Sequence, residues 1–145
     1  MAKMIDGMHA LLRKEIPAPA AADLVGFALT SFSEGEAVVT LPVTTSHTNP
    51  MGTVQGGVIS AMADAAMGWA YMTTLGEGES YTTLEMKINF LRPVWQGTLS
   101  ARGRVRRAGR AVALIECDVV DEEEKSVAYA VSTCMLLTGE RAAGR

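Results

Sequence analysis

The segment from Ser46 to Gly68 holds the residue types best suited to chemistry. It reads SHTNPMGTVQGGVISAMADAAMG, a polar loop, two adjacent glycines and an apolar run interrupted by one carboxylate, Asp64. At a helix start, Gly56 and Gly57 leave backbone N–H groups that can approach a substrate carbonyl and stabilise negative charge developing on its oxygen. The alternative is that these glycines only allow close packing against a sheet, and the residues alone do not decide between the two.

Asp64 is the sharper candidate, because it stands in a helix that is otherwise strongly apolar. An ionised carboxylate buried without partners is costly, so it requires hydrogen bonds, a hydrated cavity or a raised pKa. Catalytic acids and bases occupy such environments. The structural alternative is a carboxylate satisfied by a nearby hydroxyl such as that of Thr83 or Ser60.

The spacing of Gly56 and Asp64 bears on how they could cooperate. They are eight residues apart, which is about 12 Å along a helix, too far for one small reacting centre to contact both. If the helix packs antiparallel against a copy of itself, Gly56 of one subunit can face Asp64 of the other, giving two shared sites. The spacing therefore predicts an obligate dimer.

Cationic residues gather at one predicted hairpin. The cluster consists of Arg102, Arg104, Arg106, Arg107 and Arg110. Because a guanidinium forms forked hydrogen bonds with phosphate oxygens, the cluster suits phosphate recognition, with Arg107 and Arg110 at the tip as the better candidates. The alternative is a solvated face paired with Glu116 and Asp118.

His47 is one of two histidines and lies in the polar loop without an identifiable carboxylate partner. We therefore expect it to structure the loop or to line the substrate rim rather than to act as a base. No nucleophile elbow accompanies it, so a Ser-His-Asp hydrolase is not indicated.

The pattern of apolar residues predicts the elements that position these groups. A short helix is predicted over 4–12 within the first fifteen residues, and a long helix over 53–75 that has no polar face and should be buried all round. Strands are predicted at 23–30, 37–43, 81–91, 98–106, 111–120 and 126–138. A three-residue turn in the arginine hairpin would place Arg102 opposite Glu116. Residues 140–145 are expected to form a flexible tail.

This order of elements predicts an α+β fold in which a strongly curved antiparallel sheet wraps around one long buried helix. The 145 residues, 48% of them hydrophobic, suffice for one domain spanning 1–145. Because one wrapped sheet leaves an edge strand and part of the helix uncovered, a dimer is again expected.

Composition limits the functions that are plausible. Thirteen Lys and Arg against sixteen Asp and Glu give a net charge of -3, which argues against a nucleic-acid binder. No apolar run is long enough for a membrane span, and charges interrupt the N-terminal segment, so a cytoplasmic protein without membrane attachment is expected. Cys117 and Cys134 are expected to be buried free thiols, and no Cys/His spacing indicates a metal site.

Six spaced residues resemble a family signature. They are Asn49, Gly52, Gln55, Gly56, Gly57 and Asp64. This string resembles the N-x-x-G-x-x-H-G-G-x-x-x-x-x-x-D signature of hotdog-fold acyl-CoA thioesterases of the phenylacetate-degradation (PaaI-like) type, relatives of 4-hydroxybenzoyl-CoA thioesterase. TLEMKINFLRP at 83–93 resembles the strand that follows the helix in that family. The resemblance implies a hotdog fold, hydrolysis of acyl- or aryl-CoA, no cofactor beyond the CoA of the substrate, and a homodimer that pairs into a tetramer.

The resemblance also implies roles for individual residues. The N–H of Gly56 would polarise the thioester carbonyl, and Asn49 would bind or orient reactant or water. Asp64 of the neighbouring subunit would be general base or nucleophile, with Thr83 holding the water. Gln55 stands where the family has His; an amide cannot protonate a leaving thiolate, but the CoA thiol leaves readily, so activity is expected to survive.

The remaining substrate-binding candidates are Gly57, His47, Arg107, Arg110 and Gly68. Gly68 lies one turn after Asp64 and would leave room beside the carboxylate for the acyl group. Two other functions remain open at this stage: an enoyl-thioester hydratase on the same fold, and an acyl-CoA-binding protein without catalysis. A hydratase would need a histidine with an acidic partner, and a pure binder would have no evident need for Asp64.

Overall fold

The computed structural model describes residues 2–144, so Met1 and Arg145, at the outer ends of the predicted first helix and tail, lie outside it. One six-stranded antiparallel sheet has the strand order β1-β2-β4-β5-β6-β3. Its strands are β1 (Ala28–Ser33), β2 (Glu36–Pro42), β3 (Ser80–Phe90), β4 (Thr98–Ala108), β5 (Val112–Val120) and β6 (Ser126–Leu137). The helices are α1 (Ala2–Leu12), α2 (Ala20–Val25) and α3 (Gly56–Met72), with 3-10 turns η1 (Thr45–His47) and η2 (Gly139–Arg141).

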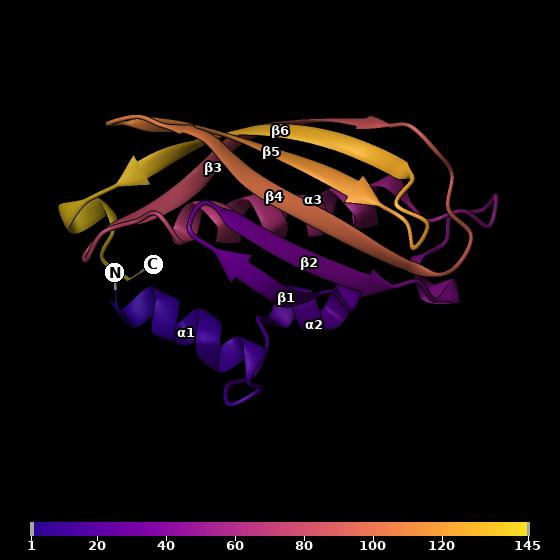
Figure 1. Cartoon of the computed structure of the whole chain (residues 1–145), viewed down its shortest axis with the longest axis horizontal. Coiled ribbons are helices and arrows are strands. Elements are labelled where there is room, and N and C mark those ends of the chain that lie inside the picture. Colours follow the sequence, from indigo (N-terminus) through magenta and orange to yellow (C-terminus); the bar gives the residue numbers. More distant parts are fainter. Residues whose placement is uncertain (1, 145) are drawn as a thin grey trace.

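The sheet curves around α3, while α1 and α2 lie below β1 and β2 (Figure 1). Apolar side chains that alternate along the central strands form the core beneath the helix; Val39, Leu41, Leu99, Ala101, Ile115 and Cys117 are fully buried. Cys117 and Cys134 are both buried and unbridged, as predicted. A curved antiparallel sheet wrapped around one long helix is the predicted hotdog architecture.

Gly103 in β4 is the point at which helix and sheet approach most closely. A Cβ at this position would lie 2.3 Å from the carbonyl oxygen of Ala66 and 2.8 Å from the amide nitrogen of Met67, both in the backbone of α3. Only a residue without a side chain allows this approach. Gly103 therefore fixes the height of α3 above the sheet, and with it the place of every residue that α3 carries.

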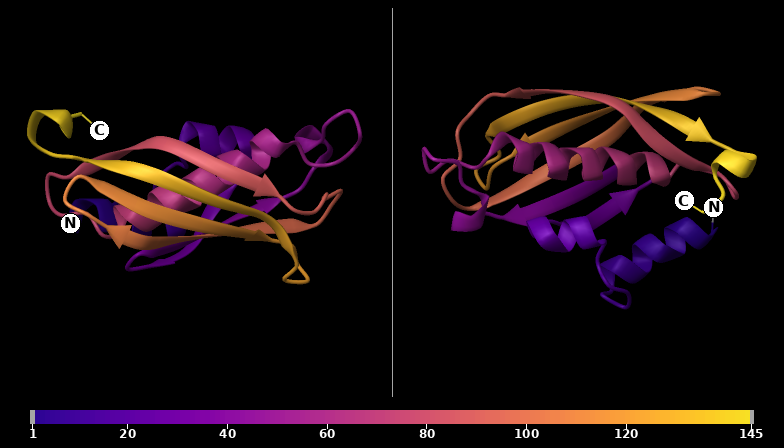
Figure 2. Two further views of the ribbon diagram at one scale, coloured as in Figure 1. Left: turned by 90° about the horizontal axis from the view of Figure 1, so that it is seen from above. Right: turned by 180° about the vertical axis from the view of Figure 1, so that it is seen from behind.

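One side of α3 is not covered by the sheet. Seen from behind, the helix lies in front of the strands (Figure 2, right). Gly57 and Asp64 are exposed on this side, and Val58, Ser60 and Ala61 are only partly buried. Six strands curl around only part of the circumference of α3, so one chain does not bury the helix all round; that a dimer covers the remaining side stays a prediction.

Two local predictions are corrected. Residues 23–25 belong to the short helix α2, which follows Pro19 and ends at Gly26 with φ 94°, so only the second part of the predicted strand 23–30 is extended. In the arginine hairpin Glu116 lies opposite Arg104 rather than Arg102, because the chain turns at 110–111, beyond the predicted turn, and a bulge at Arg106 then shifts the register by one residue. An extra residue in one strand leaves no trace in the apolar pattern.

Candidate active site

The uncovered side of α3 lies alongside the edge strand β3, and the two run in opposite directions. Gly56 contacts the ring of Phe90, Asp64 bonds to Thr83, and Gly68 contacts Tyr81. We call the space between them the α3–β3 groove. A bulge at Leu84 shifts the pairing of β3 with β6, so that Thr83 and Met86 face the helix together. The groove therefore runs past both groups that were predicted to take part in the chemistry, the N–H groups at the start of α3 and the carboxylate of Asp64.

Asp64 opens onto a shallow cleft of about 340 Å³ in this groove. Its lining residues are Ser60, Ala61, Asp64, Thr83, Leu84, Glu85 and Met86. The Thr83 hydroxyl donates to Asp64 Oδ1 at 3.3 Å, whereas Ser60 bonds to the carbonyl of Gly56 within its own helix at 2.8 Å. Of the two hydroxyls considered for satisfying the carboxylate, Thr83 is the one that contacts it. Asp64 is nevertheless exposed, so in a single chain water reaches it freely.

Thr83 also contacts the neighbouring strand β6 of the sheet. Its Oγ1 lies 3.7 Å from Sγ of Cys134 on β6. Burial raises the pKa of the Cys134 thiol, so this sulfur stays protonated and serves as a neutral neighbour rather than a nucleophile. Asp64 and Thr83 thus form one hydrogen-bonded end of the groove, with Cys134 packed behind Thr83.

The other end of the groove is the start of α3. Gln55 caps the helix by its backbone, without a side-chain hydrogen bond. The N–H groups of Gly56 and Gly57 belong to the first turn, which has no intrahelical acceptors. The Phe90 ring packs directly on Gly56, where a Cβ would lie 2.9 Å from the ring. Gly57 faces open space. A second cleft of about 350 Å³ lies beside Gly56, and Asn49, Phe90 and Arg92 also help to line it.

Asn49 shapes the loop that leads to these donors. Its Oδ1 accepts hydrogen bonds from the N–H groups of Met51 at 3.0 Å and Thr53 at 3.2 Å, and its Nδ2 donates to Oγ1 of Thr53 at 2.8 Å. Most of its hydrogen-bonding capacity is thus used inside the loop. Asn49 lines the cleft beside Gly56, but its bonds in the described structure are those of a residue that holds the loop in shape.

His47 is buried and anchors the same loop from its other side. Its Nδ1 accepts from the N–H of Thr44 at 3.0 Å, which leaves the proton on Nε2 for the bond to the carbonyl of Val25. The backbone of His47 also accepts from the N–H of Gln55 at 2.8 Å. Of the two roles expected for His47, these contacts are those of loop structuring; the ring does not face the groove.

The space beside Gly68 is not open, although the sequence had predicted that it would be. The space beside it is filled by Tyr81, whose hydroxyl oxygen would lie 2.2 Å from a Cβ at Gly68. The room that the sequence indicated for an acyl group is therefore occupied by an aromatic side chain from β3. The sequence analysis did not identify Tyr81, because the contact joins residues that are separated in the chain and no local sequence pattern predicts it.

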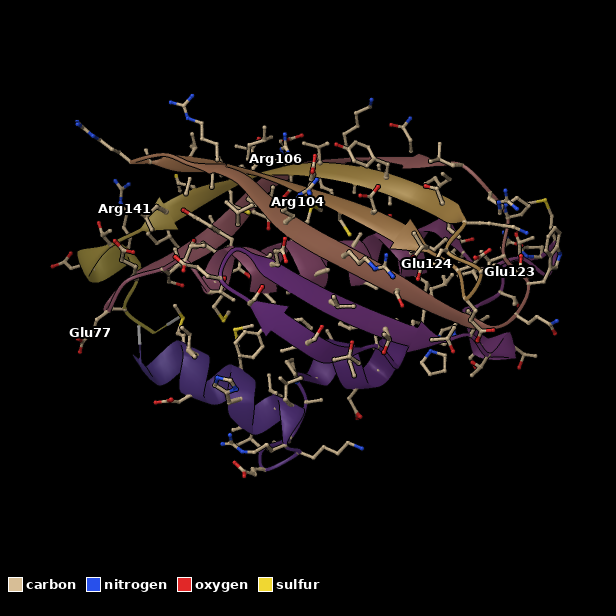
Figure 3. The ribbon with its side chains drawn as sticks, in the orientation of Figure 1. Glu77, Arg104, Arg106, Glu123, Glu124 and Arg141 are labelled. Atoms are coloured by element: carbon tan, nitrogen blue, oxygen red, sulfur yellow. The ribbon has the colours of Figure 1, made fainter. Side chains whose placement is uncertain are left out.

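The arginine cluster divides into two parts. On the outer surface of the sheet Arg104 and Arg106 of β4 (Figure 3) pair with Glu116, while Arg102 pairs with Glu124. Hydrogen bonding by Arg104, and secondarily by Tyr129, lowers the pKa of Glu116. These three guanidinium groups match the alternative of a solvated, paired face, although the second partner is Glu124 and not Asp118.

Arg107 and Arg110 form no ion pair among the residues that the structure describes. They lie at the β4–β5 turn, and both β5 and β6 stand between β4 and β3 in the sheet. Within one chain the structure therefore does not bring Arg107 or Arg110 to the α3–β3 groove.

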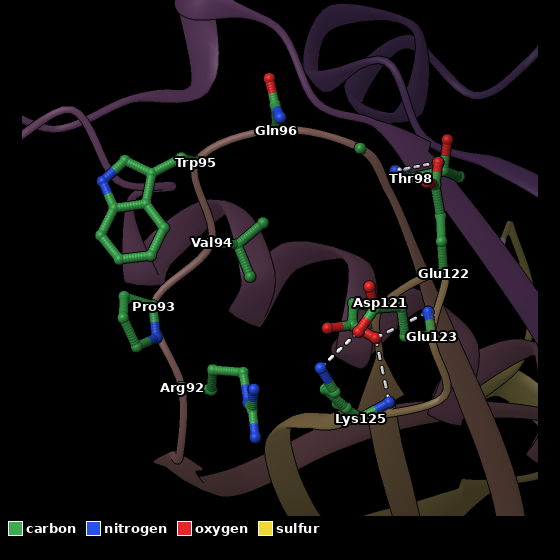
Figure 4. Close-up of a pocket in the computed structure, with 11 residues that line it drawn as sticks. Arg92, Pro93, Val94, Trp95, Gln96, Thr98, Asp121, Glu122, Glu123 and Lys125 are labelled. Carbon is green, nitrogen blue, oxygen red and sulfur yellow. Dashed lines mark hydrogen bonds and ion pairs between the residues drawn. The ribbon is translucent and has the colours of Figure 1, made fainter.

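A different cation lies near the groove. Arg92 lies two residues after the end of β3 and lines both the cleft beside Gly56 and a larger hollow of about 920 Å³ (Figure 4). The hollow is bounded by residues 92–98 and by acidic and basic side chains of residues 121–125. The sequence analysis did not identify Arg92, because a single arginine between a strand and Pro93 does not stand out as a charge cluster. Its position at the end of the strand that resembles the family could have indicated it.

Among residues 2–144 no group of three or more His, Cys, Asp or Glu side chains is placed to hold a metal ion. No described helix is long and apolar enough to span a membrane.

Comparison with known proteins decides the family. The thioesterase superfamily matches residues 51–128, which include α3, the groove and most of the sheet. The chain belongs to the thioesterase superfamily. The acyl-coenzyme A thioesterase PaaI of Escherichia coli is 33% identical over 110 residues, covering 75% of this chain and 76% of PaaI.

Solved structures agree with this assignment. The structure of Escherichia coli PaaI superposes with a TM-score of 0.82 at 29% identity, covering 95% of this chain and 96% of PaaI. A thioesterase of Haemophilus influenzae superposes with a TM-score of 0.80 at 28% identity, covering 83% of this chain and 85% of that one. The fold is thus the hotdog fold, and family and neighbours support a thioester hydrolase.

Proposed function

We propose that this thioesterase hydrolyses acyl- or aryl-CoA thioesters at a site shared between two copies of the chain. The observation that carries the proposal is the α3–β3 groove, with Asp64 and Thr83 at one end and the free N–H groups of Gly56 and Gly57 at the other. The name of the relative PaaI supports CoA thioesters as the substrate class.

The chemistry requires a carboxylate and an amide donor at one carbonyl carbon. The N–H of Gly56 would stabilise the oxyanion while Asp64 either activates a water held by Thr83 or attacks directly. The CoA thiolate would leave without an acid, so the exposed amide of Gln55 is sufficient at that position. Metal and cofactor chemistry has no part in this proposal.

Sharing between subunits follows from distance and exposure. Gly56 and Asp64 lie about 12 Å apart on one helix, so a carbonyl cannot contact both in one chain. The edge strand β3 carries exposed apolar side chains, Leu84 and Phe90, each 53% exposed. A second copy packed antiparallel across this edge would cover them and bring its own Asp64 to Gly56. Further pairing of such dimers into tetramers is part of the same proposal.

The CoA portion of the substrate would leave the groove at the Gly56 end. Arg92 lines the cleft there and is placed to bind a phosphate oxygen. Arg107 and Arg110 would reach a substrate only across a subunit boundary. We therefore assign the first phosphate contact to Arg92 and keep Arg107 and Arg110 as contacts from a neighbouring copy.

The experiment is a thiol-release assay with a panel of acyl- and aryl-CoA thioesters. Asp64→Asn should lower kcat by at least about a hundredfold, as loss of a general base or nucleophile does, while Arg92→Gln should raise KM and leave kcat nearly unchanged. Asp118→Asn, an exposed carboxylate on the outer face, is the matched control. Full activity in Asp64→Asn would overturn the assigned chemistry.

A complementation experiment tests the sharing separately. Gly56→Val blocks one end of the groove and Asp64→Asn disables the other, so each variant alone should be inactive. Co-expressed in equal amounts, they should recover about a quarter of wild-type activity, because half the dimers would then contain one intact site of two. A mixture as inactive as its components would overturn the shared site and leave the thioesterase activity itself untouched.

A further inference from the structure

Tyr81 closes the α3–β3 groove one helical turn beyond the carboxylate. Gly68 stands four residues after Asp64 on the same face of α3, and Tyr81 stands two residues before Thr83 on β3. The cleft at Asp64 is lined as far as Thr83 and does not include Tyr81. The groove thus ends where the hydroxyl of Tyr81 meets the backbone of Gly68.

Several contacts hold Tyr81 in this position. Its ring packs edge-on against that of Tyr71, with centroids 5.6 Å apart and an interplanar angle of 70°. Burial raises the pKa of the Tyr81 hydroxyl, so it stays a neutral phenol. Because Gly68 has no Cβ, the ring reaches the helix backbone itself, and a larger residue at 68 would push it away. The aromatic side chain is therefore a fixed wall rather than a mobile surface group.

The direction of the substrate follows from the two ends of the groove. With its carbonyl near Asp64, a thioester has room on the side of Ser60 and Met86, which line the open cleft there. That side suits the long polar CoA arm. The acyl group must then extend the other way along α3, toward Gly68, and it meets Tyr81 within one turn.

Another apolar space lies nearby but is separate. A cavity of about 540 Å³ between the N-terminal helices and β1 is lined by Leu12, Phe27, Leu29 and Trp69 among others, and it shares no lining residue with the cleft at Asp64. Trp69 is five residues after Asp64, so it points about 140° away around the helix. An acyl group bound at Asp64 has no path to this cavity along the groove.

We propose that Tyr81, seated on Gly68, sets the depth of the acyl pocket and restricts this thioesterase to short acyl groups. The inference rests on the proposed function and adds its acyl specificity. Tyr81 is a specificity-determining residue here; the reaction itself does not use its hydroxyl.

The test is kcat/KM for acetyl-, butyryl-, hexanoyl-, octanoyl- and decanoyl-CoA with wild type, Tyr81→Leu and Tyr81→Phe. The wild type should favour the short members. Tyr81→Leu should raise the ratio of decanoyl to butyryl turnover at least about tenfold, since a few methylenes in an apolar pocket already discriminate by that factor. Tyr81→Phe keeps the ring and should retain the wild-type profile.

Two further variants keep the test decisive. Tyr129→Leu removes a tyrosine from the outer face, where its hydroxyl bonds to Glu116 at 2.9 Å, and should leave the chain-length profile unchanged. If Tyr81→Leu fails to fold, Tyr81→Met keeps more of the packed volume and carries the same expectation.

The outcomes separate the two proposals. No cleavage of any CoA thioester by the wild type would overturn the proposed function and this inference with it. Cleavage by a folded Tyr81→Leu or Tyr81→Met with an unchanged chain-length profile would overturn the role of Tyr81 alone. A wild type that prefers decanoyl-CoA would do the same.

Discussion

Replacement of Gly103 by Ala should destabilise the protein, although alanine is normally the better residue in a strand. A strand glycine usually costs about 0.5–1 kcal/mol relative to alanine, so without a steric conflict Gly103→Ala would raise stability. Here the added Cβ would lie 2.3 Å from the carbonyl oxygen and 2.5 Å from the carbonyl carbon of Ala66. Ordinary contacts of this kind are near 3.5 Å, so α3 and β4 must separate by roughly 1 Å.

The cost of that separation should be at the upper end of the range for overpacking, about 3 kcal/mol, because the obstacle is helix backbone that cannot rotate away. In a chain of this size each kcal/mol lowers Tm by about 2–4 °C, so we expect a decrease of about 6–12 °C. Thermal unfolding followed by circular dichroism, with a urea titration as a second measure, gives both quantities.

Gly57→Ala is the matched control for stability. It adds the same methyl group to α3 on the uncovered side, where nothing lies within 4 Å of the new atom. Alanine is favoured over glycine in a helix by up to about 1 kcal/mol, so Tm should stay the same or rise. A Gly103→Ala variant with wild-type or higher Tm would refute the close seating of α3 on β4.

Two further predictions concern groups away from the groove. His47→Ala should cost about 1–3 kcal/mol, because two backbone groups lose their partners, yet kcat should fall far less than in Asp64→Asn; equal losses of kcat would make His47 part of the chemistry. Arg104 lowers the pKa of Glu116 below its ordinary 4.5, so the carboxylate stabilises the fold above that pH and loses this contribution as pH falls through the lower folded value. The Tm difference between wild type and Glu116→Gln should thus be present at neutral pH and shrink in acid, and a pH-independent difference would contradict the pairing.

Much of the site could be predicted from the sequence because it depends on local pattern. The helix that carries Asp64 and the strand that carries Thr83 were predicted to within a few residues of α3 and β3, since their apolar periodicity extends over many residues. The contact between the two side chains follows once strand and helix lie side by side. The short helix α2 has only six residues, too few for periodicity to separate it from a strand.

Other parts of the site depend on contacts that no local pattern encodes. A bulge adds one residue and changes which side chains face the helix, and the bulge at Leu84 is what places Met86 on the same side as Thr83. Tyr81 fills the space at Gly68 through a contact between residues thirteen positions apart. The sequence indicated the room that a glycine leaves, and only the packing identifies the side chain that occupies it.

The exposure of Asp64 supports the proposed pairing more directly than the spacing does. A carboxylate in open water is surrounded by solvent dipoles that must reorganise before it can take a proton or attack a carbonyl, whereas an enclosed site replaces them with fixed groups. The described chain supplies one such group, the hydroxyl of Thr83. The half-buried Ala61 and Ala65 flank Asp64 on α3 and offer no polar contact. A second helix packed antiparallel over these alanines would exclude water from Asp64. The same helix would place the N–H of its own Gly56 beside the carboxylate. One packing contact would therefore both enclose and complete the proposed site.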